Sequence, residues 1–368
     1  LSLFLLYDIG KDAGYAPLVT EGQTETQAWQ ETETPAGELP GRYDCRENQK
    51  APTLKNQGTL GTCWAVAASS VLESRLLPQE SIVFSADHIS AQNSYATGQD
   101  EGGAYMISTA YLTAWQGPVT EEMDPYGDGQ TSEGLLPVCH VQEVQMVTDR
   151  DFTSVKELIY TYGAVQSSLY MDLGGEKVRS PYYNRENASY YYDGEEEINH
   201  DMLLIGWDDD YPAENFTRKP SVNGAFICQN SWGDGFGEDG IFYVSYEDTQ
   251  IGRHNISYAG VESAENYSHI FQTDLCGWTG QLGYGKEEAW CANVYEAEEK
   301  GTVEAAGFYA MVPDTEYALY GAAVPGDMEP REILSGLGGD RMPLLASGRL
   351  GEAGFYTIPF EAPVEVKA

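Results

Sequence analysis

The stretch from Gln57 to Trp64 constrains this chain most, because it places a cysteine at the predicted start of a helix. Residues 64–77 are rich in helix formers and carry apolar side chains at a helical period. Thr62 is a suitable N-cap, which makes Cys63 the first helical residue. Unpaired N–H groups and the helix dipole favour a thiolate there. The alternative is a small buried cysteine, since free cysteine is among the most buried residue types.

Two further groups that acyl transfer needs lie elsewhere in the chain. Gln57 stands six residues before Cys63, and two glycines between them allow the loop to fold back over the helix start. The Gln57 amide and the Cys63 backbone N–H would then stabilise an oxyanion beside the sulfur. His200 is the candidate base, because it begins an apolar run at 198–207 that predicts a buried strand. The other histidines lack such a context: His88, His140, His254 and His269.

Asn230 supplies the remaining polar group. It follows an apolar strand predicted at 226–229 and precedes a glycine-rich turn. Its amide oxygen can accept a hydrogen bond from the imidazole of His200 and fix the orientation of the ring. Trp232 would cover that hydrogen bond from water. The candidate catalytic residues are therefore Gln57, Cys63, His200 and Asn230.

In its motifs and their order, the chain resembles the papain family of cysteine peptidases over residues 42 to 250. The resemblance rests on Gln57, the pair Cys63-Trp64, the histidine that leads a strand, and the segment Asn230-Ser231-Trp232-Gly233. It implies an α+β, two-lobed papain-like fold, with a helical lobe and a β-barrel-like lobe. It also implies a cysteine endopeptidase that hydrolyses peptide bonds through a thioester and needs no cofactor and no metal.

The resemblance further implies a substrate-binding strip. Gly102 and Gly103 are similar to the paired glycines that receive a substrate backbone, where an extended peptide can pair as an added strand. Trp64 and Trp232 are the other candidate substrate-binding residues. The alternative is that the two glycines only form part of a loop before a helix predicted at 104–115.

The chain departs from the family pattern at three positions near these motifs. Leu60 stands where many members have a cysteine that forms a disulfide, so we expect the loop that holds Gln57 to be fixed by packing alone. Thr62 replaces the usual Ser or Ala. Asn199 precedes the histidine where an aspartate is common, which would change how a cation on His200 is stabilised.

The charge of the chain limits its partners and its setting. A formal net charge of −38 argues against nucleic-acid binding, for which a basic patch would be the footprint, and would attract basic substrates. No apolar stretch approaches a membrane span, and we expect a secreted or cell-surface protein. The acidic run 208–210 could bind calcium, but a solvated charge run is favoured.

Of the six cysteines, Cys276 and Cys291 could pair across neighbouring strands.

Three regions are predicted. Residues 1–41 read as an N-terminal arm or linker, in which Leu3 to Leu6 could be a strand, and residues 42–262 form the papain-like domain. Residues 265–368 alternate short apolar runs with Gly, Pro and acidic turns, which indicates a β-sandwich. This region resembles the lectin-like domain attached to bacterial papain-type peptidases. The sequence stops within a predicted strand, so further domains or the last strand of this domain could be missing from it.

The resemblance implies protein or peptide substrates, and a glycan or cell-surface ligand for the C-terminal domain. Two alternatives keep the fold and change the function. In the first, the chain is a surface-binding or adhesion protein whose papain-like domain has lost its chemistry, because a fold does not guarantee an activity. In the second, the acyl group is transferred to an amine instead of water. The spacing of Gln57 and an asparagine as the third group favour the peptidase.

Overall fold

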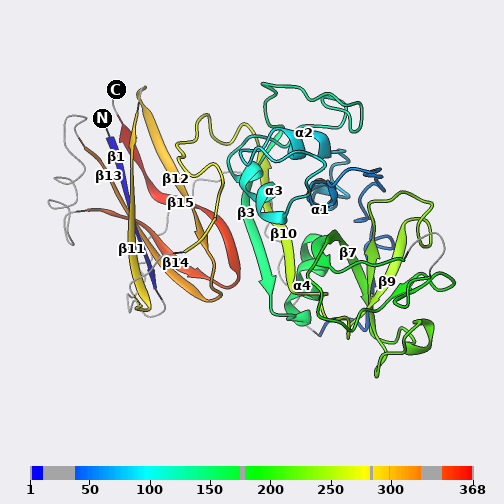
Figure 1. The fold of residues 1–368 in the computed structure, drawn as a ribbon. Helices are drawn as coiled ribbons and strands as arrows, with labels where there is room; N and C mark the ends of the chain where they lie inside the picture. The colour runs from blue at the N-terminus through cyan, green and yellow to red at the C-terminus, as the bar shows by residue number, and fades with distance from the viewer. Residues whose placement is uncertain are drawn as a thin grey trace. The chain divides into compact units, whose positions relative to one another are not determined.

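The computed structural model describes residues 2–10, 38–174, 179–281, 285–297, 299–324 and 342–366. The chain divides into two compact units, one from Gln27 to Trp278 and one that combines Leu1–Thr26 with Thr279–Ala368 (Figure 1). The smaller unit therefore takes its strands from both ends of the sequence. Most of the predicted linker, residues 11–37, lies outside the described residues.

Two helices of the larger unit, those that begin at Cys63 and Tyr105, start within one residue of the positions that the sequence predicts. Asp151 and Ser85 cap two other helices with side-chain oxygens, whereas the hydroxyl of Thr62 occupies the N-cap position of α1 without capping it. The helix α1 is buried almost all round, which is typical of a central helix. In Figure 1, α1, α2 and α3 gather on one side of the unit, and β7 and β9 lie on the other. The helices are α1 Cys63–Leu76, α2 Ala86–Ala91, α3 Tyr105–Thr113, α4 Phe152–Tyr162 and the short η1 Ala213–Asn215.

A twisted sheet forms the rest of the larger unit, with strand order β3-β10-β4-β7-β8-β9-β6-β5 and with β2 paired to β7. β7 lies between β4 and β8 and is buried along nearly its whole length, as its apolar sequence predicts. The strands are β2 Arg42–Asp44, β3 Cys139–Thr148, β4 Val165–Leu169, β5 Tyr183–Asn184, β6 Ser189–Tyr190, β7 His200–Asp208, β8 Ala225–Gln229, β9 Ile241–Ser245 and β10 His254–Ser263.

The register of this sheet sets the positions of two candidate residues. Leu169 of β4 lies opposite His200, and Gln229 of β8 lies opposite Leu203. Because β7 and β8 are antiparallel, Asn230 continues from β8 toward the beginning of β7, where His200 stands. Strand pairing therefore brings the histidine and the asparagine together, although they are far apart in the sequence.

The smaller unit is a two-layered β structure. One layer has the strand order β11-β1-β13-β14, and β12 pairs with β15 in the other. Apolar side chains of β12, β13, β14 and β15 form one shared core, among them Phe308, Leu319, Leu345 and Phe360. This arrangement agrees with the predicted sandwich. The strands are β1 Ser2–Gly10, β11 Glu288–Glu296, β12 Gly301–Ala310, β13 Thr315–Val324, β14 Leu344–Leu350 and β15 Ala353–Val366.

Residues 2–10 differ from the predicted arm or linker. They form β1, which pairs along its length with β11 on one side and with β13 on the other. The backbone N–H and C=O groups of this segment are therefore used in the ladders of the smaller unit. The continuous apolar run from Leu3 to Leu6 is compatible with a strand, but it does not reveal the partner strands.

The proposed pairing of Cys276 with Cys291 is wrong, because both are free thiols. Cys276 lies in an irregular segment, where its sulfur faces the carbonyl of Ser94 at 3.7 Å, whereas Cys291 lies in β11. They are therefore not on neighbouring strands. Within the part of the chain that the structure describes, no helix has the length and apolar character needed to cross a membrane.

Candidate active site

Cys63 is the first residue of α1, and its side chain is partly exposed. Burial raises the pKa of its thiol to about 11, and the nearby charge of Asp201 adds to that rise. The backbone N–H groups of Asp201, Trp64 and Cys63 itself face the sulfur and act in the opposite direction. The N–H groups at the helix start therefore lower the pKa of the thiol, as predicted, but burial raises it by more. The thiol is protonated at neutral pH.

Gln57 is fixed by hydrogen bonds and not by packing alone, which corrects the expectation drawn from Leu60. Its backbone N–H donates to the carbonyl of Ser231 at 2.8 Å, and Tyr126 Oη donates to its carbonyl at 3.0 Å. The Ser231 hydroxyl donates to Gln57 Oε1 at 2.5 Å, and Gln57 Nε2 donates to the carbonyl of Leu60 at 2.7 Å. Both ends of the side-chain amide are thus oriented, and the second N–H of Nε2 remains for another acceptor.

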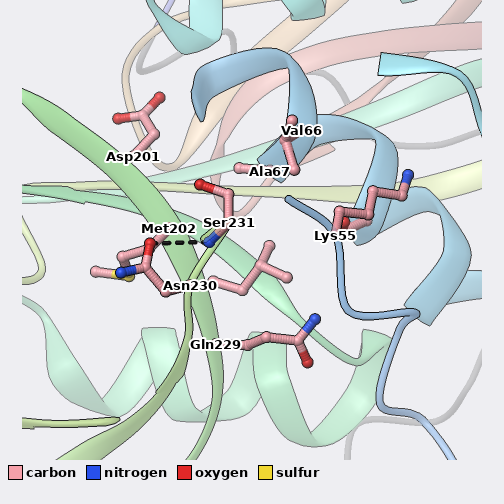
Figure 2. Close-up of a pocket in the computed structure, with 10 residues that line it drawn as sticks. Lys55, Val66, Ala67, Asp201, Met202, Gln229, Asn230 and Ser231 are labelled. Atoms are coloured by element: carbon pink, nitrogen blue, oxygen red, sulfur yellow. Dashed lines mark hydrogen bonds between the residues drawn. The ribbon is translucent and has the colours of Figure 1, made fainter. Parts of the chain in front are cut away.

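His200 is paired with Asn230, as the sequence predicts. The distance between His200 Nε2 and Asn230 Oδ1 is 2.8 Å. The backbone N–H of Ser231 also donates to Asn230 Oδ1 at 2.8 Å, which fixes the orientation of the amide (Figure 2). Since an amide oxygen only accepts, Nε2 carries the proton and Nδ1 is the free base of the neutral ring.

The surroundings of His200 keep it neutral. Burial lowers the pKa of the imidazole to about 4, and the hydrogen bond with Asn230 only partly offsets that effect. The ring of Trp232 covers the imidazole, with ring centroids 4.7 Å apart and planes inclined by 31°. Trp232 therefore shields the hydrogen bond between His200 and Asn230, as predicted from its position in the motif.

The starts of α1 and β7 are linked through Asp201 and the side chain of Gln166. Asp201 follows His200 directly, and its backbone N–H faces the sulfur of Cys63. Its carboxylate accepts from Gln166 Nε2 at 2.8 Å, and Gln166 Nε2 also lies 3.3 Å from the carbonyl of Trp64 in the first turn of α1. The first residues of the helix and of the strand are therefore held together through one polar side chain.

The predicted substrate-binding glycines lie beside the start of α1. A side chain on Gly61 would meet the backbone nitrogen of Gly102 at 2.8 Å, and one on Gly103 would meet Trp64 Nε1 at 2.3 Å. Open space lies over Gly102, which has a φ of 78°, because a Cβ added there would meet no heavy atom within 4 Å. Trp64 itself is only 2% exposed. It packs against Gly103 and offers no surface to a substrate.

A small cavity lies behind these residues, between α1 and the strands β7 and β8 (Figure 2). Gln57, Cys63 and His200 do not line it, so it is not where a substrate would meet the thiol. It is lined by Lys55, Val66, Ala67, Ser70, Asp201, Met202, Leu203, Gln229, Asn230 and Ser231.

Sequence reasoning missed three residues of the site. Ser231 orients Gln57, Tyr126 binds both the Gln57 carbonyl and the hydroxyl of Thr62, and Asp201 accepts from the Gln166 side chain that also contacts α1. A signal for Asp201 was present, since it is the one charged residue at the beginning of an otherwise apolar strand. Tyr126 gave no local signal, because its role depends on a contact with a distant loop.

Three of the four remaining histidines have structural surroundings. His88 Nδ1 bonds the hydroxyl of Tyr111 at 2.6 Å, and His140 stacks on Trp115. His254 packs against the ring of Tyr105 with centroids 5.5 Å apart. Among the described residues, no three His, Cys, Asp or Glu side chains form a group that could hold a metal ion.

The fold and this site define a class, that of the thiol proteases, and comparison with known proteins identifies the family. The family model of the papain family cysteine proteases matches residues 39–263, more than half of the chain. The chain therefore belongs to the papain family of cysteine proteases. Residues 270–368 match the family model of a lectin-like domain, which agrees with the predicted resemblance.

Curated relatives support this membership. The chain is 26% identical over 246 residues to a cathepsin L-like protein of Caenorhabditis elegans, and the match covers 62% of this chain and 64% of that protein. It is 27% identical over 248 residues to the viral cathepsin of Heliothis zea nuclear polyhedrosis virus, with 64% of this chain and 58% of the viral protein covered. The chain thus spans less than two thirds of the length of these relatives.

Solved structures confirm the predicted fold. The clostridial cysteine protease Cwp84 after propeptide cleavage superposes with a TM-score of 0.73 at 23% identity, covering 88% of this chain and 81% of that one. A structure of the cysteine protease and lectin-like domains of Cwp84, a surface layer associated protein of Clostridium difficile, gives 0.71 at 23% identity, covering 90% and 74%. The chain therefore has a papain-like α+β fold and a C-terminal lectin-like β domain.

Proposed function

We propose that this protein is a cysteine endopeptidase that hydrolyses peptide bonds through Cys63, His200, Asn230 and Gln57. The strongest support is the 2.8 Å hydrogen bond between His200 and Asn230. The next residue in the chain, Asp201, turns its backbone N–H toward the sulfur of Cys63. Burial leaves the imidazole of His200 neutral and the thiol of Cys63 protonated. Both are the forms needed at the beginning of general-base-assisted attack.

In the proposed reaction, the sulfur of Cys63 bonds to the peptide carbonyl carbon while its proton passes to Nδ1 of His200. The resulting oxyanion accepts hydrogen bonds from the Cys63 backbone N–H and from the second N–H of Gln57 Nε2. The intermediate collapses to a thioester, and the imidazolium gives its proton to the departing amine. A water molecule then attacks the thioester with His200 as base, and the carboxylic acid product leaves as the thiol is restored.

Asn230 acts on the ring and not on the substrate. Its oxygen holds His200 in the tautomer with the proton on Nε2, so that Nδ1 is available. When the ring becomes an imidazolium, the same oxygen stabilises its charge, in agreement with the rise that this hydrogen bond causes in the pKa of His200. Trp232 raises the strength of the bond by excluding water.

The test combines a mixed peptide library with a thiol-directed epoxide under reducing conditions. We expect cleavage of library peptides, one epoxide adduct on Cys63, and a loss of at least about 10³-fold in kcat/KM for Cys63→Ala. Cys276→Ala is the matched control, since Cys276 is also a partly exposed free thiol. A folded wild-type protein that takes no adduct on Cys63 and cleaves nothing would contradict the proposal and favour a binding or adhesion protein.

Transfer to an amine is distinguished in the same reaction by adding a primary amine and analysing the products by mass. Hydrolysis predicts free carboxylic acids at every amine concentration that leaves the enzyme active. Amide products that dominate over acids would instead assign the protein to acyl transfer.

We also propose that the chain acts outside the cell, with boundaries near 42–262 for the peptidase domain and 265–368 for the lectin-like domain. The strongly acidic composition suits this setting, and the structural neighbour Cwp84 is described as surface layer associated. Detection of the protein in the medium or on intact cells by antibody tests the location. Binding of the full-length Cys63→Ala variant to a glycan array tests whether the second domain takes a sugar ligand.

A further inference from the structure

The hydroxyl of Tyr126 contacts both ends of the loop that joins Gln57 to Cys63. Its oxygen lies 3.0 Å from the carbonyl oxygen of Gln57 and is also bonded to the hydroxyl of Thr62, the residue directly before Cys63. A carbonyl oxygen only accepts, so the single phenolic proton is donated to Gln57, and the Thr62 hydroxyl must donate to Tyr126. Burial raises the pKa of Tyr126, which keeps that proton in place. The three groups therefore form one directed chain of hydrogen bonds.

The two ends of this loop carry the two donors proposed for the oxyanion. One is the side-chain amide of Gln57, and the other is the backbone N–H of Cys63. That N–H belongs to the peptide unit whose carbonyl is on Thr62, and this carbonyl accepts from the backbone N–H groups of Ala65 and Val66 at 3.0 Å. Because a trans peptide is planar, fixing its carbonyl also fixes the direction of its N–H. The spacing of the two donors therefore depends on how the ends of the loop are held.

The hydroxyl of Thr62 is used in this contact and not as a helix cap. Thr62 is fully buried and occupies the N-cap position of α1, but its side chain makes no capping hydrogen bond. A threonine at that position usually stabilises its helix through such a bond. Here the hydroxyl bonds Tyr126 instead, so the contact serves the arrangement of the loop and not the stability of the helix.

Tyr126 is held in place by contacts outside the loop 57–62. Its backbone N–H donates to Glu121 Oε1 at 2.8 Å, and the backbone N–H of Glu121 donates to the carbonyl of Val83 at 2.8 Å. The carbonyl of Asp124, two residues before Tyr126, accepts from Ser85 Oγ at 2.6 Å. These bonds anchor the tyrosine to the chain at the beginning of α2. A side chain supported in this way can hold a neighbouring loop in one arrangement.

We propose that Tyr126 is a positioning residue that sets the spacing of the two oxyanion donors, the Gln57 amide and the Cys63 N–H. This inference rests on the proposed function, since both donors act in the same reaction. The phenol acts through Gln57 and Thr62 and takes no part in the bond changes. Because the oxyanion forms only in the transition state, loss of the bridge lowers kcat and leaves KM nearly unchanged.

The first test compares Tyr126→Phe with Tyr211→Phe. Tyr211 is the matched control, because its hydroxyl also donates to a backbone carbonyl at 3.0 Å, that of Asn187. For Tyr126→Phe we expect kcat to fall by about tenfold, the effect of one lost hydrogen bond, with KM nearly unchanged. Tyr211→Phe should leave both constants unchanged. An unchanged kcat in folded Tyr126→Phe, or a loss that appears only in KM, overturns the inference.

Two thiol reagents separate the oxyanion donors from the nucleophile. A peptide aldehyde bonds through its carbonyl carbon to the sulfur of Cys63, and its oxygen then occupies the oxyanion position. Iodoacetamide alkylates the same sulfur with loss of iodide and forms no oxyanion. Tyr126→Phe should weaken inhibition by the aldehyde by about tenfold and leave the alkylation rate unchanged. Equal losses with both reagents would show an action on the thiol itself and overturn the inference.

Variants of Thr62 test the chain of hydrogen bonds. Thr62→Val, which removes the hydroxyl, should lower kcat, whereas Thr62→Ser, which keeps it, should not. Thr62→Val/Tyr126→Phe should be no slower than Tyr126→Phe alone, because both residues act through one bridge. Additive losses overturn the inference. If Tyr126→Phe does not fold, the comparison of Thr62→Val with Thr62→Ser decides.

Binding of the aldehyde also separates this inference from the proposed function. If the wild type cleaves no peptide but binds the aldehyde, the loss of affinity in Tyr126→Phe still decides the role of the tyrosine. Cleavage with equal aldehyde affinity in Tyr126→Phe and the wild type overturns the inference and leaves the peptidase intact. A wild type that neither cleaves peptides nor binds the aldehyde overturns both.

Discussion

At the scale of single residues, the side-chain amide of Gln57 is held at both of its ends. Ser231 donates to its oxygen and Leu60 accepts from its nitrogen, so the amide cannot rotate without losing both hydrogen bonds. Such preorganised donors stabilise developing charge because they need no rearrangement during the reaction. The loop reaches this order without the disulfide that Leu60 replaces.

The first prediction concerns this donor. Gln57→Ala should lower kcat by about 10²- to 10³-fold with little change in KM, because the oxyanion forms only in the transition state. Ser231→Ala should lower kcat by about tenfold, because it removes one orienting hydrogen bond. Steady-state kinetics measures both, with Gln92→Ala as control, since that side chain is far less constrained. Equal activity of Gln57→Ala and the control would exclude Gln57 from the oxyanion site.

The second prediction follows from the pKa values of the pair. Because burial keeps His200 neutral down to about pH 4, kcat/KM should fall only as the pH drops toward 4, where the imidazolium cannot accept the thiol proton. Removing the hydrogen bond in Asn230→Ala should move this acid limb to still lower pH, since that bond raises the pKa of His200. A pH profile of kcat/KM checks both statements. An acid limb that moves upward in Asn230→Ala would contradict them.

At the scale of elements, the helix and the two strands that carry Cys63, His200 and Asn230 could be predicted from the sequence. The starts of α1, β7 and β8 follow from local signals, namely helix formers after a cap and apolar runs bounded by turns. The roles of Ser231 and Asp201 could not be predicted, because they depend on partners on other strands or loops. The Thr62 hydroxyl does not cap α1, because it bonds the hydroxyl of Tyr126 from a distant loop, and this contact could not be predicted either.

The third prediction concerns the pairing of β2 with β7. A side chain at Gly206 would meet the Tyr43 carbonyl oxygen at 2.2 Å and the backbone of Asp44 at 3.0 Å. Gly206→Ala should therefore destabilise the protein by about 1–3 kcal/mol, the usual cost of overpacking. Urea unfolding measures the loss. Gly235→Ala is the control, because nothing lies within 4 Å of its added carbon, and equal midpoints for both variants would contradict the close approach.

At the scale of the whole molecule, the peptidase unit is an insertion in the chain of the smaller unit, whose strands come from both ends of the sequence. The sequence predicted the β-sandwich from its C-terminal runs but assigned residues 2–10 to an arm or linker. The short apolar run from Leu3 to Leu6 is compatible with a strand, but the partner strands β11 and β13 lie near the other end of the sequence. Pairing over such a distance has no local signature.

The fourth prediction follows from this topology. Deleting residues 1–10 removes the strand between β11 and β13 and leaves an edge on each with unpaired backbone groups. We expect the smaller unit to lose protection in amide hydrogen exchange at β11 and β13, while β7 and β8 keep theirs. Unchanged protection at β11 and β13 would show that β1 does not stabilise this sheet.

The most direct test of the catalytic mechanism is the identity of the acylated residue during turnover. The protein is mixed with an activated ester of a cleaved peptide, quenched in acid, digested and analysed by mass. We predict one acyl group per chain, on the peptide that contains Cys63, formed in the wild type and absent in Cys63→Ala. Peptide cleavage that persists in Cys63→Ala, or an acyl group on Cys276 or Cys291 instead, would contradict this mechanism.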